Sequence, residues 1–341
     1  MEDGYFTLMQ QLAPDLAQEI ELRALVLERI GALQPVGRRQ LAARLNLPER
    51  EVRTVATLLK KHGLITLDAA GMCLTPAAES VLPMARRFSR DLKGLTRLET
   101  ALAEQLGVDK VCVAAGNADT DPHVLGEVGR IAGTRLRGFL QTGCTLAVTG
   151  GSTIREVAFA VPQGTPMNVM VVPARGGMGG ALETQANTLA CEIARRLGGH
   201  HRMMHLPDHL DEQALQEMRK LTEIDETLAL LERADVVLHG VGRADDMTQR
   251  RQLPGPVSAE VLRKGAVAEA YGCYFDRRGR LVYSASTVAH NLGALKHDCA
   301  MIAVAAGAKK AEAIAAVMKS RRHAMLVTDE GAAKAILGEA P

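Results

Sequence analysis

From Asp109 onward, short apolar runs alternate with helical segments, and this alternation limits the possible folds more than any other feature. Uninterrupted apolar strands separated by helices are typical of a parallel sheet buried on both faces. We therefore expect a doubly wound α/β domain over residues 108–341, with ligands bound at the carboxyl ends of its strands. The runs are KVCVAA (110–115), TLAVTG (145–150), NVMVVPA (168–174), RMMHLP (202–207), DVVLHGVG (235–242), AMIAVAAG (300–307) and AMLVTD (324–329).

The residues before this domain predict a winged helix-turn-helix over 1–88. An amphipathic helix over 18–34 is followed by a short helix over 39–45, a turn at Asn46-Leu47 and a longer helix that Pro48 opens. Two β-prone runs, LITLD and GMCLT, then predict the wing. A chain of 341 residues is also too long for one ordinary core, so two domains are expected.

Positive charge is concentrated in the helix-turn-helix. Between Val36 and His62 there are seven Lys or Arg residues against two acids, although the net charge of the whole chain is only +2. Such a surface suits a phosphate backbone, although a solvated helix face would look similar, and outward side chains of the second helix could reach base edges. The expected DNA-binding residues are Arg38, Arg39, Glu49, Arg50, Arg53, Thr54, Thr57, Lys60 and Lys61.

The two domains are expected to be joined by a linker helix over 89–107, the end of one long helix that starts near Thr75. Leucines recur along it at three and four residues and form one apolar stripe. That stripe could pair with its copy in a second subunit, or it could pack on its own chain. The leucines are Leu92, Leu95, Leu98, Leu102 and Leu106.

A possible phosphate site follows the strand over 145–150. There the chain reads GGST and then enters a helix, so backbone amides and hydroxyls could surround phosphate oxygens. A double glycine before a helix can also serve only close packing. The residues concerned are Gly150, Gly151, Ser152 and Thr153.

Cations follow three other strands of the predicted sheet. Arg175 precedes a GGMGG loop, while Arg250 and Arg251 follow the strand over 235–242. Lys310, with Lys309, stands at a helix start, where a cation opposes the helix dipole unless an anion is bound. Phosphate-binding groups on separate loops indicate a ligand with an anionic group at each end, and a sugar bisphosphate fits.

Two polar residues could complete that site. Gln185 begins a helix that could face the same crevice, and its other possible role is helix capping. Glu269 lies in the apolar stretch GAVAEAYG, where it could accept hydrogen bonds from sugar hydroxyls or pair with a core arginine.

Other functions have weaker support. A sugar-phosphate isomerase or deaminase needs a base and an acid, for which Asp245, Asp246 and Glu269, with His239, are the candidates, although the aspartates could be paired with adjacent arginines. The HHxxxH spacing of His200, His201 and His205 is poor for metal ligands, so no metal and no cofactor are expected. Without a signal peptide or a membrane-length apolar run, a cytoplasmic protein is expected.

The combined motifs resemble the central glycolytic genes regulators, a family of SorC/DeoR-type transcriptional repressors. The resemblance covers nearly the whole chain and is carried by the winged helix with TGGSTI, VPARGGMGG, QANT, HGVGRADDMTQRR, EAYGCYF, VAAGAKKAEAI and VTDEGAA. It implies a sugar-phosphate isomerase (NagB/RpiA-like) fold, as in glucosamine-6-phosphate deaminase and ribose-5-phosphate isomerase, that senses fructose 1,6-bisphosphate without catalysis. It also implies a repressor that binds operator DNA as an oligomer, a dimer in solution and a tetramer on DNA.

The resemblance implies a specific set of effector contacts. Two departures from the family pattern concern them: Ser152 stands where a Thr-Thr pair is expected, and the stretch 251–265 is divergent. The contacts are Gly150, Gly151, Ser152, Thr153, Arg175, Gln185, Arg250, Arg251, Glu269 and Lys310.

Overall fold

The chain forms two compact units, Met1–Arg97 and Leu98–Pro341. In this computed structural model, the residues described are 9, 11–175, 181–206, 212–284 and 298–339.

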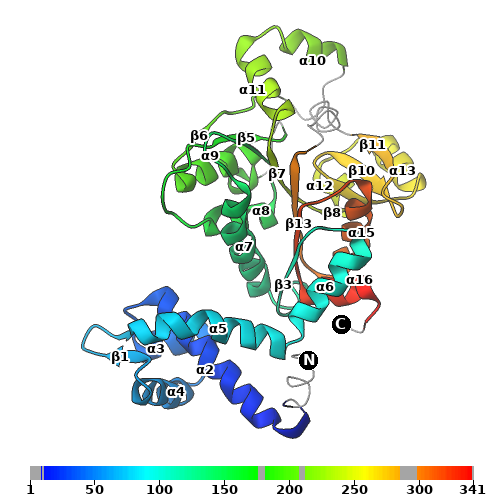
Figure 1. Cartoon of the computed structure of the whole chain (residues 1–341). Coiled ribbons are helices and arrows are strands. Elements are labelled where there is room, and N and C mark those ends of the chain that lie inside the picture. The colour runs from blue at the N-terminus through cyan, green and yellow to red at the C-terminus, as the bar shows by residue number, and fades with distance from the viewer. Residues whose placement is uncertain (1–8, 10, 176–180, 207–211, 285–297, 340–341) are drawn as a thin grey trace. The chain divides into compact units, whose positions relative to one another are not determined.

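The first unit is a winged helix-turn-helix, which confirms the fold expected for it (Figure 1). Asn46 takes the left-handed conformation (φ 52°) and turns the chain between α3 and α4, as the Asn46-Leu47 turn predicted. Val26, Ile30, Leu41 and Val52 are fully buried and hold the three helices together. The elements are α2 (Pro14–Leu33), α3 (Arg38–Leu45), α4 (Glu49–Lys61), β1 (Ile65–Leu67), β2 (Met72–Leu74) and α5 (Pro76–Leu92).

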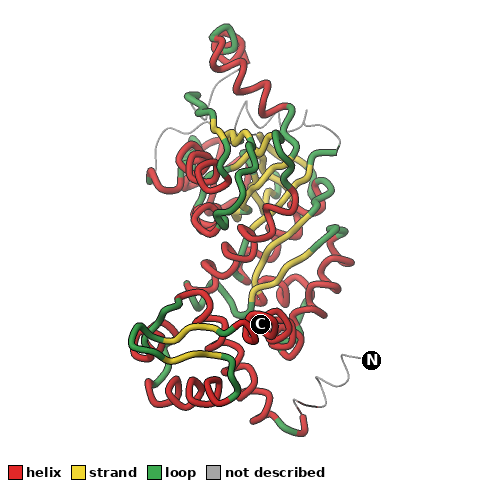
Figure 2. Tube along the Cα trace, turned by 60° about the vertical axis from the view of Figure 1, so that its left-hand side comes forward, coloured by secondary structure: helices red, strands yellow, loops and turns green. Residues whose placement is uncertain are grey.

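The wing is the antiparallel pair β1 and β2, seen as two short strands in Figure 2. Its turn is closed by Asp68, whose Oδ1 accepts hydrogen bonds from the backbone amides of Ala70 and Gly71 at 2.9 and 3.1 Å. The wing tip therefore carries an acid and small residues, and the basic residues between Val36 and His62 lie on α3 and α4.

The single long helix predicted from Thr75 to Leu106 is wrong. It is two helices, α5 and α6 (Leu95–Leu106), because Gly94 takes a positive φ of 66° that ends the first of them. The five leucines of the stripe are no more than 7% exposed, so they are already buried within their own chain. This is the second of the two roles considered for the stripe.

The second unit contains a seven-stranded sheet in which every strand pair is parallel, as the apolar runs predicted. Its order is β3-β13-β12-β7-β4-β5-β6, so the direction of winding reverses between β7 and β4. The strands are β3 (Val111–Ala114), β4 (Thr145–Val148), β5 (Met170–Pro173), β6 (His200–His201), β7 (Val236–Gly240), β12 (Ala300–Val304) and β13 (Met325–Asp329).

Helices lie on both sides of this sheet (Figures 1 and 2). On one face, fully buried residues of α7, α8 and α9 such as Val128, Ile154 and Ile193 form one core cluster with the strands. Helices α15 and α16 lie on the opposite side of β13 from α7 (Figure 1). Helices α10 to α13 also belong to this unit. The bounds of its helices from α7 onward, within the described residues, are α7 (His123–Leu136), α8 (Ser152–Ala160), α9 (Ala186–Leu197), α10 (Glu212–Met218), α11 (Thr222–Glu232), α12 (Ala244–Arg250), α13 (Gly255–Arg263), α15 (Ala311–Ser320) and α16 (Glu330–Leu337).

One predicted strand, over 202–207, is misplaced: residues 202–206 form no strand, residue 207 lies outside the described residues, and the strand of this region is β6, at His200–His201. The chain leaves the sheet because the backbone of Met204 pairs with a side chain. Asn187 donates to the Met204 carbonyl at 3.0 Å and accepts from its amide at 2.9 Å. The Asn187 side chain thus forms the hydrogen bonds with the Met204 backbone that a neighbouring strand would otherwise form.

A second, antiparallel sheet was not predicted from the sequence. Its order is β11-β10-β9-β8, and a two-residue turn at Tyr271-Gly272 joins β9 to β10. Polar residues interrupt these strands, which read AVAEA, CYFD and LVYS in β9, β10 and β11, and β8 has only two residues. They are β8 (Gly242–Arg243), β9 (Ala266–Ala270), β10 (Cys273–Asp276) and β11 (Leu281–Ser284).

Among the described residues, no helix has the length and apolar character needed to cross a membrane.

Candidate functional site

A cavity of about 170 Å³ lies at the carboxyl ends of β4 and β7, where the winding of the sheet reverses. This reversal point is where open α/β sheets bind their ligands. The cavity is lined by the β4–α8 loop, α12, the β9–β10 turn and the start of α15. It brings together eight of the ten expected effector contacts: Gly150, Gly151, Ser152, Thr153, Arg250, Arg251, Glu269 and Lys310.

The β4–α8 loop presents a helix N-terminus to the cavity. Gly150 packs so closely that an added Cβ would lie 2.6 Å from the carbonyl oxygen of Thr184, and Gly151 has a φ of 120°. The Gly151 amide donates to that same carbonyl at 2.8 Å, so it fixes the loop. The amides of Ser152 and Thr153, in the first turn of α8, have no acceptor within the helix and can serve an anion.

Cations stand on the other loops of the cavity. Arg250 ends α12 and is exposed, whereas Lys310 is partly buried at the start of α15. Burial lowers the pKa of the Lys310 ammonium, and the nearby Arg250 guanidinium lowers it further, against the opposing effect of Asp119 and other acids. A phosphate bound between these two cations would offset the electrostatic repulsion between them and favour the charged form of Lys310.

The loop that carries Lys310 is held in place by two aspartates. Asp329 is fully buried and accepts a hydrogen bond from the Gly307 amide at 3.0 Å. Asp119 accepts one from the Lys309 amide at 2.8 Å. The position of Lys310 is therefore fixed by backbone contacts that do not use its own charge.

Glu269 occupies the core side of the cavity and pairs with two arginines. Its Oε1 lies 2.9 Å from Arg251 Nη2 and 3.7 Å from Arg175 Nη1, and it accepts the Gly272 amide at 2.7 Å. Burial raises the pKa of the Glu269 carboxyl, while Arg175 and the Gly272 amide pull it down. Of the two roles considered for Glu269, pairing with arginine is the one the geometry shows.

Arg175 and Gln185 do not line the cavity itself. Arg175 is only 5% exposed and reaches the site through Glu269. Gln185 precedes α9, and the backbone of Thr184 and Ala186 on either side of it packs against Gly150. The GGMGG loop at 176–180, which follows Arg175, lies outside the described residues.

The groups considered for acid–base catalysis are engaged elsewhere. Asp245 accepts a hydrogen bond from Arg243 Nε at 3.1 Å, and that arginine lowers the pKa of the Asp245 carboxyl; Asp246 Oδ2 lies 3.8 Å from the same Nε. His239 is fully buried, with its Nε2 3.1 Å from Nε2 of His323, and burial lowers the pKa of His239 to about 3. Within the described part of the chain, no group of three or more His, Cys, Asp or Glu residues could hold a metal ion.

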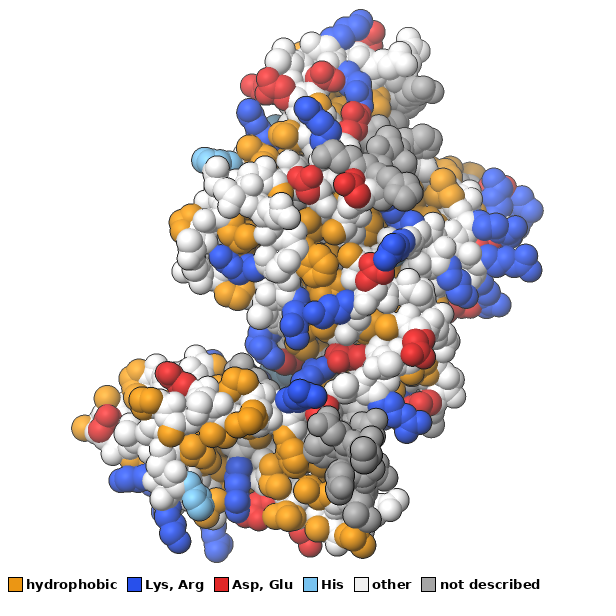
Figure 3. Space-filling model, viewed as in Figure 1, with side chains coloured by type: hydrophobic (Ala, Val, Ile, Leu, Met, Phe, Trp, Pro, Cys, Tyr) orange, Lys and Arg blue, Asp and Glu red, His pale blue; other side chains and the backbone are white. Residues whose placement is uncertain are grey.

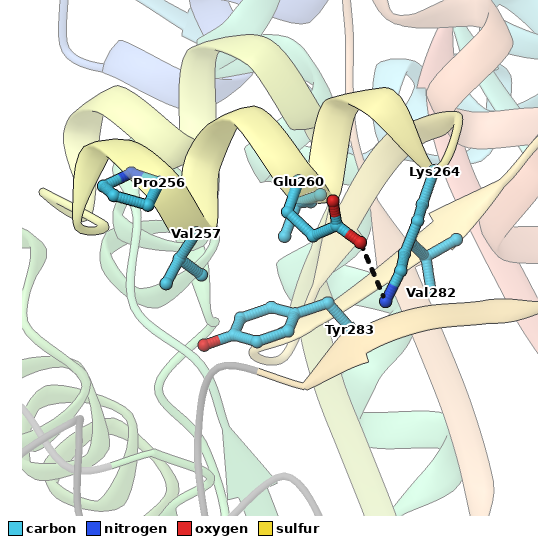
Figure 4. Close-up of a pocket in the computed structure, with 7 residues that line it drawn as sticks. Pro256, Val257, Glu260, Lys264, Val282 and Tyr283 are labelled. Atoms are coloured by element: carbon cyan, nitrogen blue, oxygen red, sulfur yellow. Dashed lines mark ion pairs between the residues drawn. The ribbon is translucent and has the colours of Figure 1, made fainter.

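A different pocket, of about 340 Å³, lies between α13 and β11 (Figure 4). Its walls are mostly apolar, with Val257, Val282 and Tyr283 facing the space below the helix. Its Lys264 is paired with Glu260 at 3.4 Å. A pocket of this chemistry suits a phosphate poorly, so the cavity between β4 and β7 is the better candidate for a sugar phosphate.

The candidate DNA interface is the outer face of α3 and α4. Eight of the nine expected residues are exposed, and Glu49 is half-buried. Lys and Arg side chains project from the α4 side of this unit in Figure 3. Glu49 accepts hydrogen bonds from Arg39 and Arg53, each at 3.3 Å, so it links the two helices.

The threonines of α4 are used differently from its arginines. Thr54 and Thr57 donate their hydroxyl protons to the carbonyls of Arg50 and Arg53, one turn earlier, at 3.0 and 2.9 Å. Their oxygens can still accept hydrogen bonds, whereas the Arg50 and Arg53 guanidinium groups extend from the exposed face of the helix.

Comparison with known proteins agrees with both units. Residues 20–88 match the family described as "CggR N-terminal DNA binding domain", and residues 90–338 match the family described as "Putative sugar-binding domain".

Similar whole proteins extend this agreement. The chain is 37% identical over 332 residues to the central glycolytic genes regulator of Priestia megaterium, with 97% of each chain covered. It is 35% identical over 329 residues to that of Bacillus subtilis, covering 96% of this chain and 97% of the relative. A crystal structure named as a putative SorC family transcriptional regulator from Enterococcus faecalis is 33% identical, with a TM-score of 0.64, over 71% of this chain and 99% of that chain.

The order of the two domains, the parallel sheet and these identities over nearly the full length all agree. The chain therefore belongs to the central glycolytic genes regulator family, a group of SorC-type transcriptional regulators in which a DNA-binding domain precedes a sugar-binding domain.

Proposed function

We propose that this protein represses central glycolytic genes and that fructose 1,6-bisphosphate, bound in the cavity between β4 and β7, weakens its hold on operator DNA. One observation carries the proposal: the cavity places a helix N-terminus, at Ser152 and Thr153, in one space with the cations Arg250 and Lys310. A ligand with two phosphates can use both. The names of the relatives support glycolytic genes as the target.

The proposed control of DNA binding is thermodynamic linkage. A bisphosphate can shift the protein away from its operator-binding arrangement only by its difference in affinity for the two arrangements. We propose that these arrangements differ in how subunits associate, with a dimer in solution and a tetramer on DNA. Because the leucine stripe is buried in its own chain, another surface would form the subunit contact.

Calorimetric titration of the full-length protein tests the ligand. Fructose 1,6-bisphosphate is expected to bind at least about 10-fold more tightly than fructose 6-phosphate, because losing one phosphate removes its charge-assisted hydrogen bonds. Equal affinities would contradict a two-phosphate site.

Incubation with each sugar phosphate, followed by product analysis, is expected to show no conversion, and steady turnover would overturn the repressor-only view.

Replacing Arg50 and Arg53 together by Ala is expected to weaken operator binding by about 10-fold or more, because both lie exposed on the outer face of α4. Fluorescence anisotropy with labelled operator at several salt concentrations measures this. If the contacts are to phosphate, the salt dependence falls and all sequences lose affinity alike. Arg87→Ala, at an exposed arginine on α5 outside the expected interface, is the control and should bind normally. Unchanged binding by the double variant would place the recognition surface elsewhere.

Bisphosphate affinity is expected to fall as the pH rises. In the ligand-free protein the pKa of Lys310 is lowered, and a bound phosphate would raise it again. Affinity is thus constant while Lys310 is protonated in both states and declines over the pH range in which the free state loses its proton, which begins below the range usual for a lysine because the pKa of Lys310 is lowered. Titrations across that range measure it, and an identical slope in Lys310→Met would mean that another group is responsible.

A further inference from the structure

Asp329, the last residue of β13, is a buried acid that does not line the cavity. It is fully buried, and no Lys, Arg or His side chain of the described residues lies within ion-pairing distance of it. A buried carboxylate without a counter-charge is costly unless hydrogen bonds hold it. The partners of this carboxylate therefore indicate what Asp329 is for.

Those partners are backbone amides from three separate elements. Oδ2 of Asp329 accepts the Ala118 amide, in the loop after β3, at 2.7 Å, and both oxygens accept the Gly307 amide, in the loop after β12, at 3.0 Å. Oδ1 also accepts the Ala332 amide in the first turn of α16, at 3.0 Å, which is an ordinary helix N-cap. Because β13 lies between β3 and β12, one carboxylate at its end ties the loops of both neighbouring strands together.

The Gly307 contact leads directly to Lys310. Gly307 has a φ of 104° and precedes the turn Ala308–Lys310, in which the Lys310 amide donates to the Gly307 carbonyl at 3.0 Å. A Cβ added at Gly307 would lie 2.6 Å from Oδ1 of Asp119, so this turn packs against the same loop that Ala118 belongs to. Contacts within the protein therefore fix the turn at both ends before any ligand binds.

A lysine gains from such support because its long side chain loses conformational freedom on binding. If the backbone is already fixed, less order has to be imposed when the ligand arrives. The charge of Asp329 acts in the same direction: burial and Arg250 lower the pKa of the Lys310 ammonium, while Asp119 and Asp329 oppose that effect.

We propose that Asp329 is a positioning residue of the effector site. It fixes residues 307–310 in the ligand-free protein and thereby holds Lys310 where its ammonium meets a phosphate, without touching the ligand itself. This inference rests on the proposed function of the cavity.

A double-mutant cycle of Asp329→Asn with Lys310→Met tests this role. Asparagine keeps the shape, but it has one accepting oxygen, and its NH2 group cannot accept from the amides that the carboxylate bound. Asp329→Asn alone is expected to lose at least about 10-fold in fructose 1,6-bisphosphate affinity by calorimetry. In the Lys310→Met background the further loss should be below about 3-fold, because no ammonium remains to be positioned. Equal losses in both backgrounds, or no loss from the single change, would overturn the assignment.

Asp276→Asn is the matched control for a loss of turn hydrogen bonds. Asp276 ends β10 and accepts the amides of Arg278 and Arg280, each at 2.9 Å, in a turn that does not line the cavity. Its variant should bind the bisphosphate within about 3-fold of the unmodified protein, even if its melting temperature falls. If it binds as poorly as Asp329→Asn, general loosening of the unit explains the loss and the inference fails.

Hydrogen exchange in the unmodified protein decides the case in which Asp329→Asn does not fold. The peptide that covers residues 305–311 is expected to exchange slowly without ligand, and the bisphosphate should slow it by less than about 3-fold further. A large gain in protection on binding would show that the ligand orders this turn, which would overturn the inference.

The outcomes also separate this inference from the proposed function. If the unmodified protein binds the bisphosphate and Asp329→Asn binds it equally well, only the role of Asp329 fails. If the unmodified protein does not bind the bisphosphate, the proposed function fails and this inference fails with it.

Discussion

Replacing Lys310 by methionine is expected to weaken fructose 1,6-bisphosphate binding by about 10- to 100-fold, with operator binding unchanged in the absence of the sugar. The ammonium would form charge-assisted hydrogen bonds to a phosphate, and such bonds contribute roughly 1.5 to 3 kcal/mol each. Methionine keeps an unbranched side chain of similar length, so the packing at the start of α15 should survive.

The same substitution should leave the ligand-free protein as stable or more stable. Burial and Arg250 disfavour the charged form of Lys310, so this cation destabilises the ligand-free protein. An uncharged methionine removes that destabilisation. A gain in melting temperature with a loss of ligand affinity is the expected signature of a residue kept for binding.

Calorimetry and operator release by the bisphosphate measure the effect on binding. Lys309→Met is the matched control, because Lys309 is the adjacent cation, is exposed and does not line the cavity. If Lys310→Met responds to the sugar as the unmodified protein does, the second phosphate lies elsewhere. Adding Arg250→Ala to the Lys310 variant should deepen the loss if the two cations hold the same phosphate.

Replacing Glu269 by leucine is expected to destabilise the sugar-binding unit by about 3 kcal/mol or more. Glu269 is buried between Arg251 and Arg175, and Arg175 is only 5% exposed, so removing the carboxylate leaves buried positive charge without its counter-charge. Breaking a buried ion pair from one side is among the most costly single changes. The Gly272 amide also loses its acceptor, which loosens the β9–β10 turn.

Urea unfolding followed by circular dichroism measures this loss. Glu260→Leu is the control: Glu260 also pairs with two cations, Arg263 and Lys264, but on the exposed face of α13. It should unfold at the same urea concentration as the unmodified protein. A Glu269→Leu variant as stable as the control would show that Arg175 and Arg251 do not depend on this carboxylate.

Much of the fold follows from local pattern. The helix-turn-helix was predictable because Asn46, Pro48 and the apolar spacing of α2 and α4 act over a few residues. The parallel strands other than β6 were predictable because each is a short, mostly apolar run, whereas β6 is His200–His201. The break at Gly94 was missed because the leucine spacing continues across it, and a positive φ at one glycine does not disturb that spacing.

The antiparallel sheet was missed for a related reason. Its strands come from a stretch with mixed polarity, and β8 is only Gly242–Arg243. Such strands are stabilised by pairing with one another and by packing, which a single segment does not reveal. Tyr271, which is among the residues that line the cavity, was missed with them, since its position depends on the β9–β10 turn.

The sequence by itself determined the chemistry of the chain: a basic helix-turn-helix, a parallel sheet, and phosphate-binding residue types at the ends of several strands. The tertiary structure decided which of these residues meet. Gly150, Arg250, Glu269 and Lys310 share one cavity because the winding of the sheet reverses between β4 and β7, while Arg175 lies behind Glu269. The physical reason is that capping, periodicity and charge act between near neighbours, whereas strand order and burial depend on contacts between residues far apart in the chain.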